Sequence, residues 1–201
     1  MKLVFVGPQA SGKGTQGKII ASKLKIPHIS SGDLLRNATG ELKEKIEEYT
    51  SKGMLAPSEI VLELIQRRIN QKDCKEGFIL DGFPRNLEQV KELEKITSID
   101  KVIEISISDD EAVRRLTSRV TCELCAAVFN EITNPPKVKG KCDFCGGRLV
   151  RRTDDNEAPI RQRLKVYHEQ TEPILSEYDS IKINGQQSIE KVTEDVLKSL
   201  S

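Results

Sequence analysis

The sequence predicts an α/β protein in which helices cover both faces of a parallel sheet, with a cysteine-rich insertion near the middle of the chain. Short apolar runs typical of buried strands recur along the chain, and each stands beside a stretch whose apolar residues have helical spacing. Residues 122–149 interrupt this alternation, because they hold few apolar runs, several Gly and Pro residues, and four of the five cysteines. We therefore expect an inserted subdomain there.

The elements follow in order along the chain. Strands are expected at 2–6, weakly at 26–29, and at 78–80, 102–105 and 181–183. Helices are expected after Lys13, at 60–69, after Ser108, at 160–178 and at 189–200. Ser108 to Glu111 has the pattern of a capping box that opens its helix, and we expect the helix at 160–178 to bend at Pro173.

Composition narrows the function classes. The chain of 201 residues is 37% hydrophobic and 31% charged, as in an ordinary folded protein rather than a disordered one. Its formal charge of +1 provides no strong field for a polyanion, which argues against nucleic-acid binding by bulk charge. The four apolar residues before Gly7 are too few for a signal-peptide core or a membrane span. We expect a cytoplasmic protein without membrane contact.

Residues 7–15, which we call the phosphate loop, read GPQASGKGT and lie between a predicted strand and a predicted helix. Backbone N–H groups of such a loop converge on phosphate oxygens, the helix N-terminus adds partial positive charge, and Lys13 adds a full one. Thr15 is placed to reach an accompanying Mg²⁺. A glycine-rich turn that binds nothing is the alternative, and it explains neither the lysine nor the two flanking elements. Gly14, between Lys13 and Thr15, is typical of nucleoside-monophosphate kinases.

Four cysteines form two C-x2-C knuckles, Cys122 with Cys125 and Cys142 with Cys145, sixteen residues apart. This spacing is typical of a zinc ribbon, in which four thiolates fill a tetrahedral shell and leave no site for water. We therefore expect a structural Zn²⁺. Two disulfides, free thiols, or another metal such as iron are the alternatives.

Five motifs in order resemble the adenylate kinase family, in its zinc-binding, long-lid type: the phosphate loop and residues 29–36, 81–85, 151–155 and 161–164. The resemblance implies a P-loop NTPase-type core at 1–29, 57–117 and 156–201. It also implies an inserted helical flap for the nucleoside monophosphate at 30–56 and an inserted zinc-ribbon-like lid at 118–155. The implied reaction is a reversible, Mg²⁺-dependent phosphoryl transfer from ATP to AMP that gives two ADP for adenine nucleotide homeostasis, carried out by a monomer.

The same resemblance implies the roles of individual residues. AMP would be bound by Ser31, Arg36, Met54, Leu55, Ala56, Gly82, Phe83, Pro84, Arg85, Gln89, Arg152 and Arg163. ATP would be bound by Ala10, Ser11, Gly12, Lys13, Gly14, Thr15, Arg115, Arg119, Val128, Phe129 and Gln187. The catalytic residues would be Lys13, Arg85, Arg119, Arg152 and Arg163, while Asp33 and Asp81 would order the water shell of Mg²⁺. Guanidinium forks suit phosphate, and the transfer needs positioning and charge rather than a base.

The chain departs from the family pattern at a few positions. Ala10 stands where a glycine is usual, which would cost about 1 kcal/mol if the backbone there has φ > 0. Val120 replaces a second arginine at the lid hinge. Phe129 can stack on the ATP adenine, and we expect Gln187 to approach it through its backbone.

Three residues outside the motifs, Cys74, His28 and His168, are expected to have no functional role. Two other functions stay open at this point. One is a UMP/CMP kinase or a GTP-dependent relative, because base choice depends on a few hydrogen bonds. The other is a zinc-ribbon adaptor for nucleic acid, against which the near-neutral charge argues.

Overall fold

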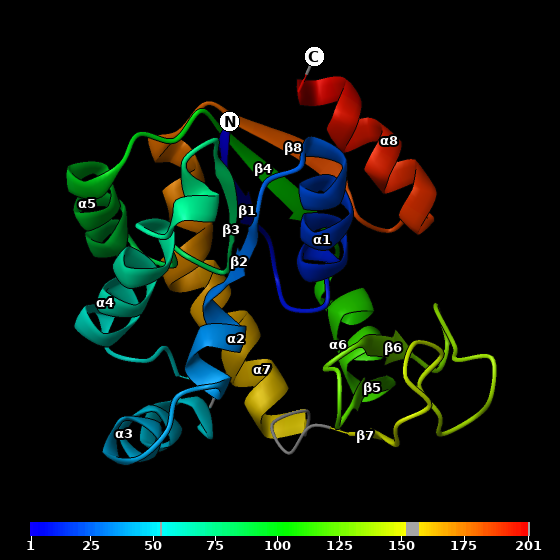
Figure 1. The fold of residues 1–201 in the computed structure, drawn as a ribbon. Coiled ribbons are helices and arrows are strands. Elements are labelled where there is room, and N and C mark those ends of the chain that lie inside the picture. Colours follow the sequence, from blue (N-terminus) through cyan, green and yellow to red (C-terminus); the bar gives the residue numbers. More distant parts are fainter. Residues whose placement is uncertain (53, 152–156, 201) are drawn as a thin grey trace.

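The computed structural model describes residues 1–52, 54–151 and 157–200. Its core is a five-stranded parallel sheet in the order β2-β3-β1-β4-β8 (Figure 1). The strands are β1 (Lys2–Val6), β2 (His28–Ser30), β3 (Phe78–Asp81), β4 (Lys101–Ser106) and β8 (Ser180–Asn184). The predicted α/β class and all five predicted strands are confirmed, including the weak candidate, which begins two residues later than expected.

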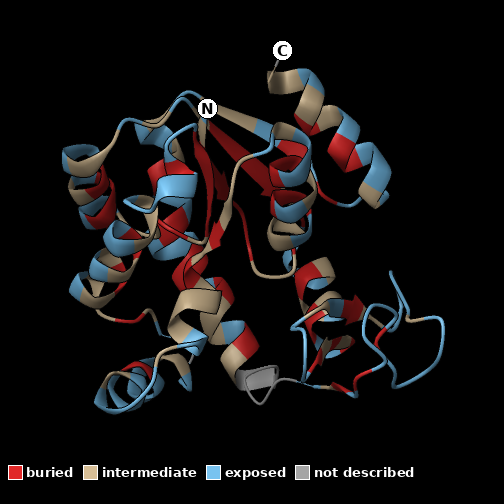
Figure 2. Ribbon diagram, viewed as in Figure 1, coloured by how far each residue is buried: buried red, intermediate tan, exposed pale blue. Residues whose placement is uncertain are grey.

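Helices cover both faces of this sheet, as Figure 1 shows. One face packs against α1 (Lys13–Leu24) and α8 (Ile189–Leu200), and the other against α4 (Ser58–Ile69) and α5 (Leu87–Ile96). In β1, Leu3 and Phe5 point to the first face, whereas Val4 and Val6 point to the second. Because helices cover both faces, the central strands β1, β3 and β4 are buried at almost every position, whereas the edge strands β2 and β8 each have one buried residue (Figure 2).

All parallel strands end at the same edge of the sheet, and the additional elements lie beyond this edge (Figure 1). The flap contributes α2 (Ser31–Arg36) and α3 (Glu41–Thr50), while α6 (Asp109–Thr117) leads into the lid. The lid has an antiparallel sheet in the order β6-β5-β7, built from β5 (Arg119–Cys122), β6 (Val128–Asn130) and β7 (Leu149–Val150). Ligands of open parallel sheets bind at this edge, so flap and lid flank the expected site.

Ser108 caps α6 as predicted, since its Oγ accepts a hydrogen bond from the Glu111 N–H at 3.4 Å, but the predicted box is not closed, because the Ser108 N–H donates to Gln186 Oε1 at 3.0 Å instead of to Glu111. A short 3₁₀ turn, η1 (Lys72–Cys74), precedes β3. No helix among the described residues combines the length and the apolar character that crossing a bilayer requires.

The prediction of one long helix at 160–178 that bends at Pro173 is wrong in its details. The α-helix α7 (Glu157–Val166) ends seven residues before Pro173, and a π turn, η2 (Tyr167–Thr171), and a 3₁₀ turn, η3 (Glu172–Glu177), follow it. Pro173 has no N–H to donate to the carbonyl of Glu169. The preceding turn widens instead, so that the Glu172 N–H donates to the Tyr167 carbonyl oxygen.

Candidate active site

The phosphate loop connects the end of β1 to the start of α1 through three residues with positive φ: Gly7 at 148°, Ala10 at 60° and Gly12 at 101°. A side chain at Gly7 would clash with the carbonyl oxygen of Ile105, whereas Gly12 has open space and depends on its backbone angle alone. Because its φ is positive, Ala10 is in the left-handed conformation, which costs an alanine about 1 kcal/mol more than a glycine. Such a loop turns successive N–H groups inward.

Lys13 folds back over the phosphate loop, where its Nζ donates to the carbonyl oxygens of Gly7 at 2.7 Å and Pro8 at 2.8 Å. Burial lowers the pKa of Lys13 to about 8, although Asp81 opposes this shift, and the charges of Arg85 and Arg119 lower it further. The ammonium is thus short of compensating negative charge. An incoming phosphate would supply that charge.

Lys13 belongs to a group of basic residues that we call the cation cluster: Lys13, Arg36, Arg85, Arg119 and Arg163. Burial lowers the pKa of Arg85, which Asp81 opposes, while Arg163 and Arg36 lower it further. These side chains come from five different parts of the chain, and like charges brought together in this way repel unless an anion binds between them. Such a concentration of positive charge can attract polyanionic ligands.

Asp81 is the acidic residue that faces the cation cluster from the end of β3, and it is only 9% exposed. Burial would raise its pKa, but the hydrogen bond with His28 and the charges of Lys13 and Arg85 outweigh burial, and the pKa is lowered. The Oδ2 atom lies 3.3 Å from the position a Cβ would take at Gly14, so the carboxylate adjoins the phosphate loop.

His28, for which no functional role was expected, lies beside Asp81 at the edge of the site. Its Nε2 lies 3.3 Å from Asp81 Oδ2, and its ring packs so closely on α1 that a side chain at Gly17 would clash with it. The contact arises because β2 and β3 are parallel neighbours that end at the same edge. In the sequence, His28 lies in a candidate strand. Its contact with Asp81 becomes apparent only when the order of the strands in the sheet is known.

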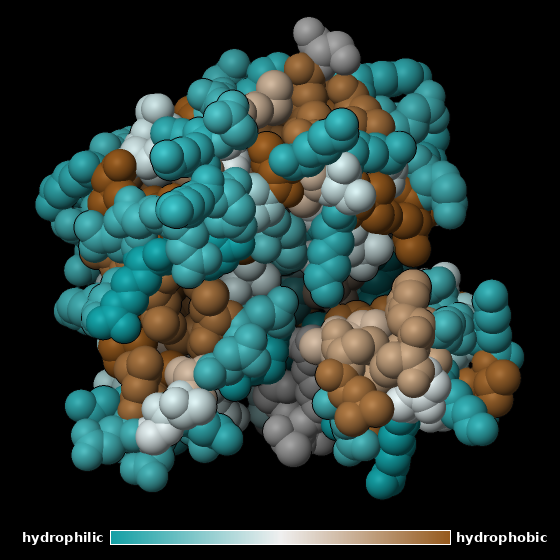
Figure 3. Space-filling model, in the orientation of Figure 1, coloured by the Kyte–Doolittle hydropathy of each residue, from teal (hydrophilic) through white to brown (hydrophobic). Residues whose placement is uncertain are grey.

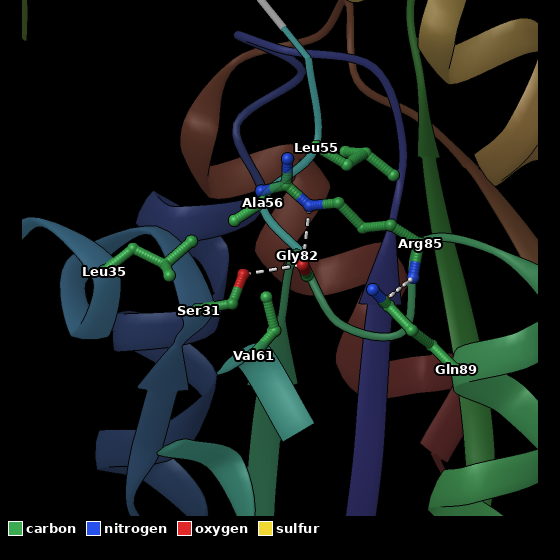
Figure 4. Close-up of a pocket in the computed structure, with 8 residues that line it drawn as sticks. All are labelled: Ser31, Leu35, Leu55, Ala56, Val61, Gly82, Arg85 and Gln89. Carbon is green, nitrogen blue, oxygen red and sulfur yellow. Dashed lines mark hydrogen bonds between the residues drawn. The ribbon is translucent and has the colours of Figure 1, made fainter. Parts of the chain in front are cut away.

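A pocket opens between the flap and the loop after β3 (Figure 4), and we call it the flap pocket. It is lined by Ser31, Leu35, Leu55, Ala56, Val61, Gly82, Arg85 and Gln89. Ser31 Oγ and Arg85 Nε both donate to the Gly82 carbonyl oxygen at 2.6 Å, and the Arg85 N–H donates to Gln89 Oε1 at 2.8 Å. Apolar walls with a polar, cationic end suit a flat base that carries a phosphate.

Six of the residues expected to bind AMP line the flap pocket, and two that were not expected, Leu35 and Val61, line it as well. Phe83 is fully buried in the core. Met54 is 43% exposed, and its sulfur accepts a hydrogen bond from Gln162 Nε2 at 3.6 Å. Arg152, expected at both the AMP site and the catalytic centre, lies outside the described residues.

The residues expected around ATP fall into distinct environments. Within the described chain, Ser11 Oγ of the phosphate loop is buried without a hydrogen-bond partner. Phe129 is only 4% exposed and packs inside the lid against Phe144, with ring centroids 5.9 Å apart, so little of its ring is open for stacking. The Gln187 side chain turns to α8, where its Nε2 donates to Asp195 Oδ2 at 2.9 Å.

Arg115 uses its donors on the protein itself. Nη1 donates to the Ala10 carbonyl oxygen at 3.3 Å and Nη2 to the Gly185 carbonyl oxygen at 2.9 Å. Arg115 therefore joins the phosphate loop to residues 185–187 after β8, which we call the base-side loop.

The four lid cysteines come together as the sequence predicts, with all four sulfurs within 4.8 Å of one another. Cys122 Sγ lies 3.4 Å from Cys145 Sγ, and Cys125 Sγ lies 3.5 Å from Cys142 Sγ. A tetrahedral shell with Zn–S bonds of about 2.3 Å has S–S edges of about 3.8 Å. The cluster therefore has the size and the donors to hold a metal ion.

The two knuckles have the same backbone conformation. In each, the residue after the second cysteine has positive φ, 56° at Ala126 and 72° at Gly146, and its N–H donates to the carbonyl oxygen of the first cysteine. The N–H groups of Cys125 and Leu124 lower the pKa of Cys122 to about 7, which favours a thiolate ligand.

The phosphate loop, the cation cluster and the adjacent pocket together define a phosphotransferase that acts on nucleotides. A family model described as adenylate kinase matches residues 5–183. The chain is 44% identical over 213 aligned residues to the adenylate kinase of Caldicellulosiruptor saccharolyticus, covering 100% of this chain and 99% of the relative. It is 43% identical over 208 residues to that of Archaeoglobus fulgidus, covering 98% and 96%. The chain belongs to the adenylate kinase family, and it transfers a phosphoryl group from ATP to AMP. The predicted activity is thereby confirmed.

Proposed function

We propose that ATP lies along the phosphate loop and that AMP occupies the flap pocket, so that their phosphates meet in the cation cluster. The observation that carries this proposal is the mutual repulsion of Lys13, Arg85 and their cationic neighbours, which two nucleotide phosphate chains would relieve. Core, flap and lid would then be the three working units, at 1–29, 57–117 and 156–201, at 30–56, and at 118–155.

In this arrangement the AMP phosphate is the nucleophile, and no protein side chain has to act as a base. Lys13, Arg85 and Arg163 of the core, with Arg119 and Arg152 of the lid, neutralise charge on the transferring phosphoryl group. The role of Arg152 rests on the resemblance alone. Closure of the flap and lid would exclude water, which competes as a nucleophile.

Mg²⁺ would be held near Asp81. This carboxylate is buried, stays ionised and adjoins the phosphate loop at Gly14, as an acceptor for the water shell of the ion should. Thr15 offers a hydroxyl in the next turn. Asp33 is 44% exposed and paired with Arg36 Nη2 at 2.6 Å, so it would have to leave this ion pair to join the shell. When bound with ATP, Mg²⁺ neutralises part of the phosphate charge.

Gln89 is the residue we assign to the AMP base. It is only 3% exposed, its Oε1 is held by the Arg85 N–H, and its Nε2 lies 3.3 Å from Ser58 Oγ. These bonds fix the orientation of the amide and leave its second N–H and its second oxygen lone pair for a base, and a base that cannot match them leaves a buried polar group unpaired.

The metal in the lid would be Zn²⁺ in a structural role, because four thiolates fill its coordination shell and leave no open position. Reduced thiolates need a reducing compartment, which supports the expected cytoplasmic location. A monomeric state follows from the resemblance alone.

Initial rates with a panel of AMP, UMP, CMP and GMP against ATP and GTP test the substrate assignment. We expect a strong preference for ATP with AMP. Gln89→Leu should raise the KM for AMP by about 10- to 100-fold, as expected when a buried hydrogen bond to substrate is lost. The matched control is Gln66→Leu, an exposed glutamine on α4, which should change nothing. A preference for UMP or CMP would overturn the assignment.

A further inference from the structure

Glu111 and Arg115 form an ion pair one turn apart on α6. Glu111 Oε1 accepts from Arg115 Nε at 2.6 Å, and both side chains are largely buried, 13% and 14% exposed. Most intrahelical pairs of this kind are exposed and contribute little. Partial burial makes this pair different, because little water reaches either charge as an alternative partner.

Glu111 is further fixed from a second direction. Arg114 donates to it through Nε at 2.7 Å and through Nη2 at 2.8 Å. Hydrogen bonds from Arg114 and then Arg115 outweigh burial and lower the pKa of Glu111 to about 2. The carboxylate therefore stays charged over the whole physiological range and holds Arg115 in one orientation.

With Nε held by Glu111, the two terminal nitrogens of Arg115 reach two different loops. Nη1 donates to Ala10 in the phosphate loop, and Nη2 donates to Gly185 in the base-side loop. A planar guanidinium has fixed angles between its donors, so its orientation sets the separation of the two carbonyl groups. Without Glu111, the unpaired cation would be free to turn towards bound phosphates.

The main chain of Arg115 is tied to the lid. Asn130 Nδ2 donates to the Arg115 carbonyl oxygen at 2.8 Å, while Asn130 Oδ1 accepts from the N–H groups of Ile132 at 3.0 Å and Thr133 at 2.9 Å. Arg115 thus contacts the phosphate loop, the base-side loop and Asn130 of the lid.

We propose that Glu111 is a positioning residue of the ATP site, which holds Arg115 so that the phosphate loop and the base-side loop keep the separation that ATP spans. The inference rests on the proposed placement of ATP along these two loops. It predicts that Glu111 matters for a ligand that reaches both loops and not for one that reaches the phosphate loop alone.

The test compares Glu111→Ala and Glu111→Gln with wild type at fixed free Mg²⁺. Glu111→Ala should raise the KM for ATP by about tenfold, and Glu111→Gln by less, because its amide oxygen still accepts from Arg115. The KM for AMP should stay within twofold. Inhibition by inorganic tripolyphosphate, which has no base, should also stay within twofold. The matched control is Glu63→Ala, because Glu63 pairs with Arg67 on α4 with the same spacing and distance, 2.6 Å, but on the surface.

Three outcomes would overturn the inference. They are an unchanged KM for ATP in Glu111→Ala, equal rises for ATP and AMP together with a lower melting temperature, or a loss of tripolyphosphate binding as large as that of ATP. Lys13→Met tests the placement of ATP independently of the role of Glu111. If Lys13→Met leaves inhibition by tripolyphosphate unchanged, the placement of ATP is wrong. If that inhibition is lost, the placement of ATP stands, and the Glu111 variants then decide whether Glu111 positions the ATP site.

Discussion

The nucleotide core and the lid are held together in opposite ways. The core buries both faces of its sheet, and this apolar interior can carry desolvated ionic groups such as Lys13, Arg85 and Asp81. The apolar cluster of the lid consists of Val120, Cys122, Phe129, Cys142 and Leu149, two of which are cysteines of the metal cluster. Desolvated charges thus lie in the part of the molecule with the larger apolar interior, while the small lid, with little apolar burial, contains the four-cysteine cluster that could hold a stabilising metal ion.

Removal of the metal should have the largest effect on the difference between lid and core. Structural zinc contributes on the order of 10 kcal/mol to small thiolate domains, more than the lid could replace by burial. In Cys142→Ser, or after chelation, we expect metal analysis to show the ion lost. Amide hydrogen exchange should lose protection in the described lid residues, 118–151, and keep it in the strands of the core.

The matched control for metal loss is Cys74→Ala, because Cys74 is a buried cysteine of the core. It should keep its metal and its lid protection, while core stability falls as it does for any buried truncation. Full lid protection in the metal-free protein would contradict the proposed role of the metal.

Lys13→Met should have the next largest effect, on activity rather than on folding. Removing the phosphate-loop ammonium should reduce the rate of ADP formation about 10³-fold or more, equivalent to about 4 kcal/mol of transition-state stabilisation. The control is Lys18→Met, an exposed lysine of the same helix, which should be nearly silent. Wild-type turnover in a folded Lys13→Met protein would contradict the site.

The desolvation of Lys13 should also make the stability of the folded protein depend on pH. The pKa of Lys13 is about 8 in the folded protein and 10.5 ordinarily, so between these values the unfolded chain binds more protons. Wild-type stability should therefore rise with pH from about 8 to 10.5 relative to Lys13→Met, by on the order of 1–3 kcal/mol. Urea unfolding of both proteins at pH 7, 9 and 10 measures this, and a constant difference would show that Lys13 is not desolvated.

The smallest effect concerns the two knuckles. Ala126 and Gly146 have equivalent left-handed conformations, which glycine adopts without strain. Ala126→Gly should stabilise the lid by about 0.5–1 kcal/mol, the αL penalty less the added freedom of the unfolded chain. Gly146→Ala should destabilise it by a similar amount. Lid hydrogen exchange measures both, and changes of the same sign would contradict the equivalence of the knuckles.

The sequence analysis succeeded where the signal lies within a few residues. The strands were recognisable as apolar runs, the phosphate loop by its spacing, and the knuckles by their paired cysteines. The contact between His28 and Asp81 could not be foreseen, because it depends on β2 and β3 being neighbours, which neither segment specifies alone. The sequence analysis also missed that Phe129 is buried against Phe144, a contact that depends on how the lid folds.

The fold class, the phosphate loop and the four-cysteine cluster could be read from the sequence alone, because periodicity and short spacings dictate local geometry directly. Only the tertiary structure decided how residues distant in the chain meet: the cation cluster around Asp81, the flap pocket, and the tie from Glu111 through Arg115 to Gly185. These contacts depend on strand order and helix packing, in which every element contributes to the position of every other.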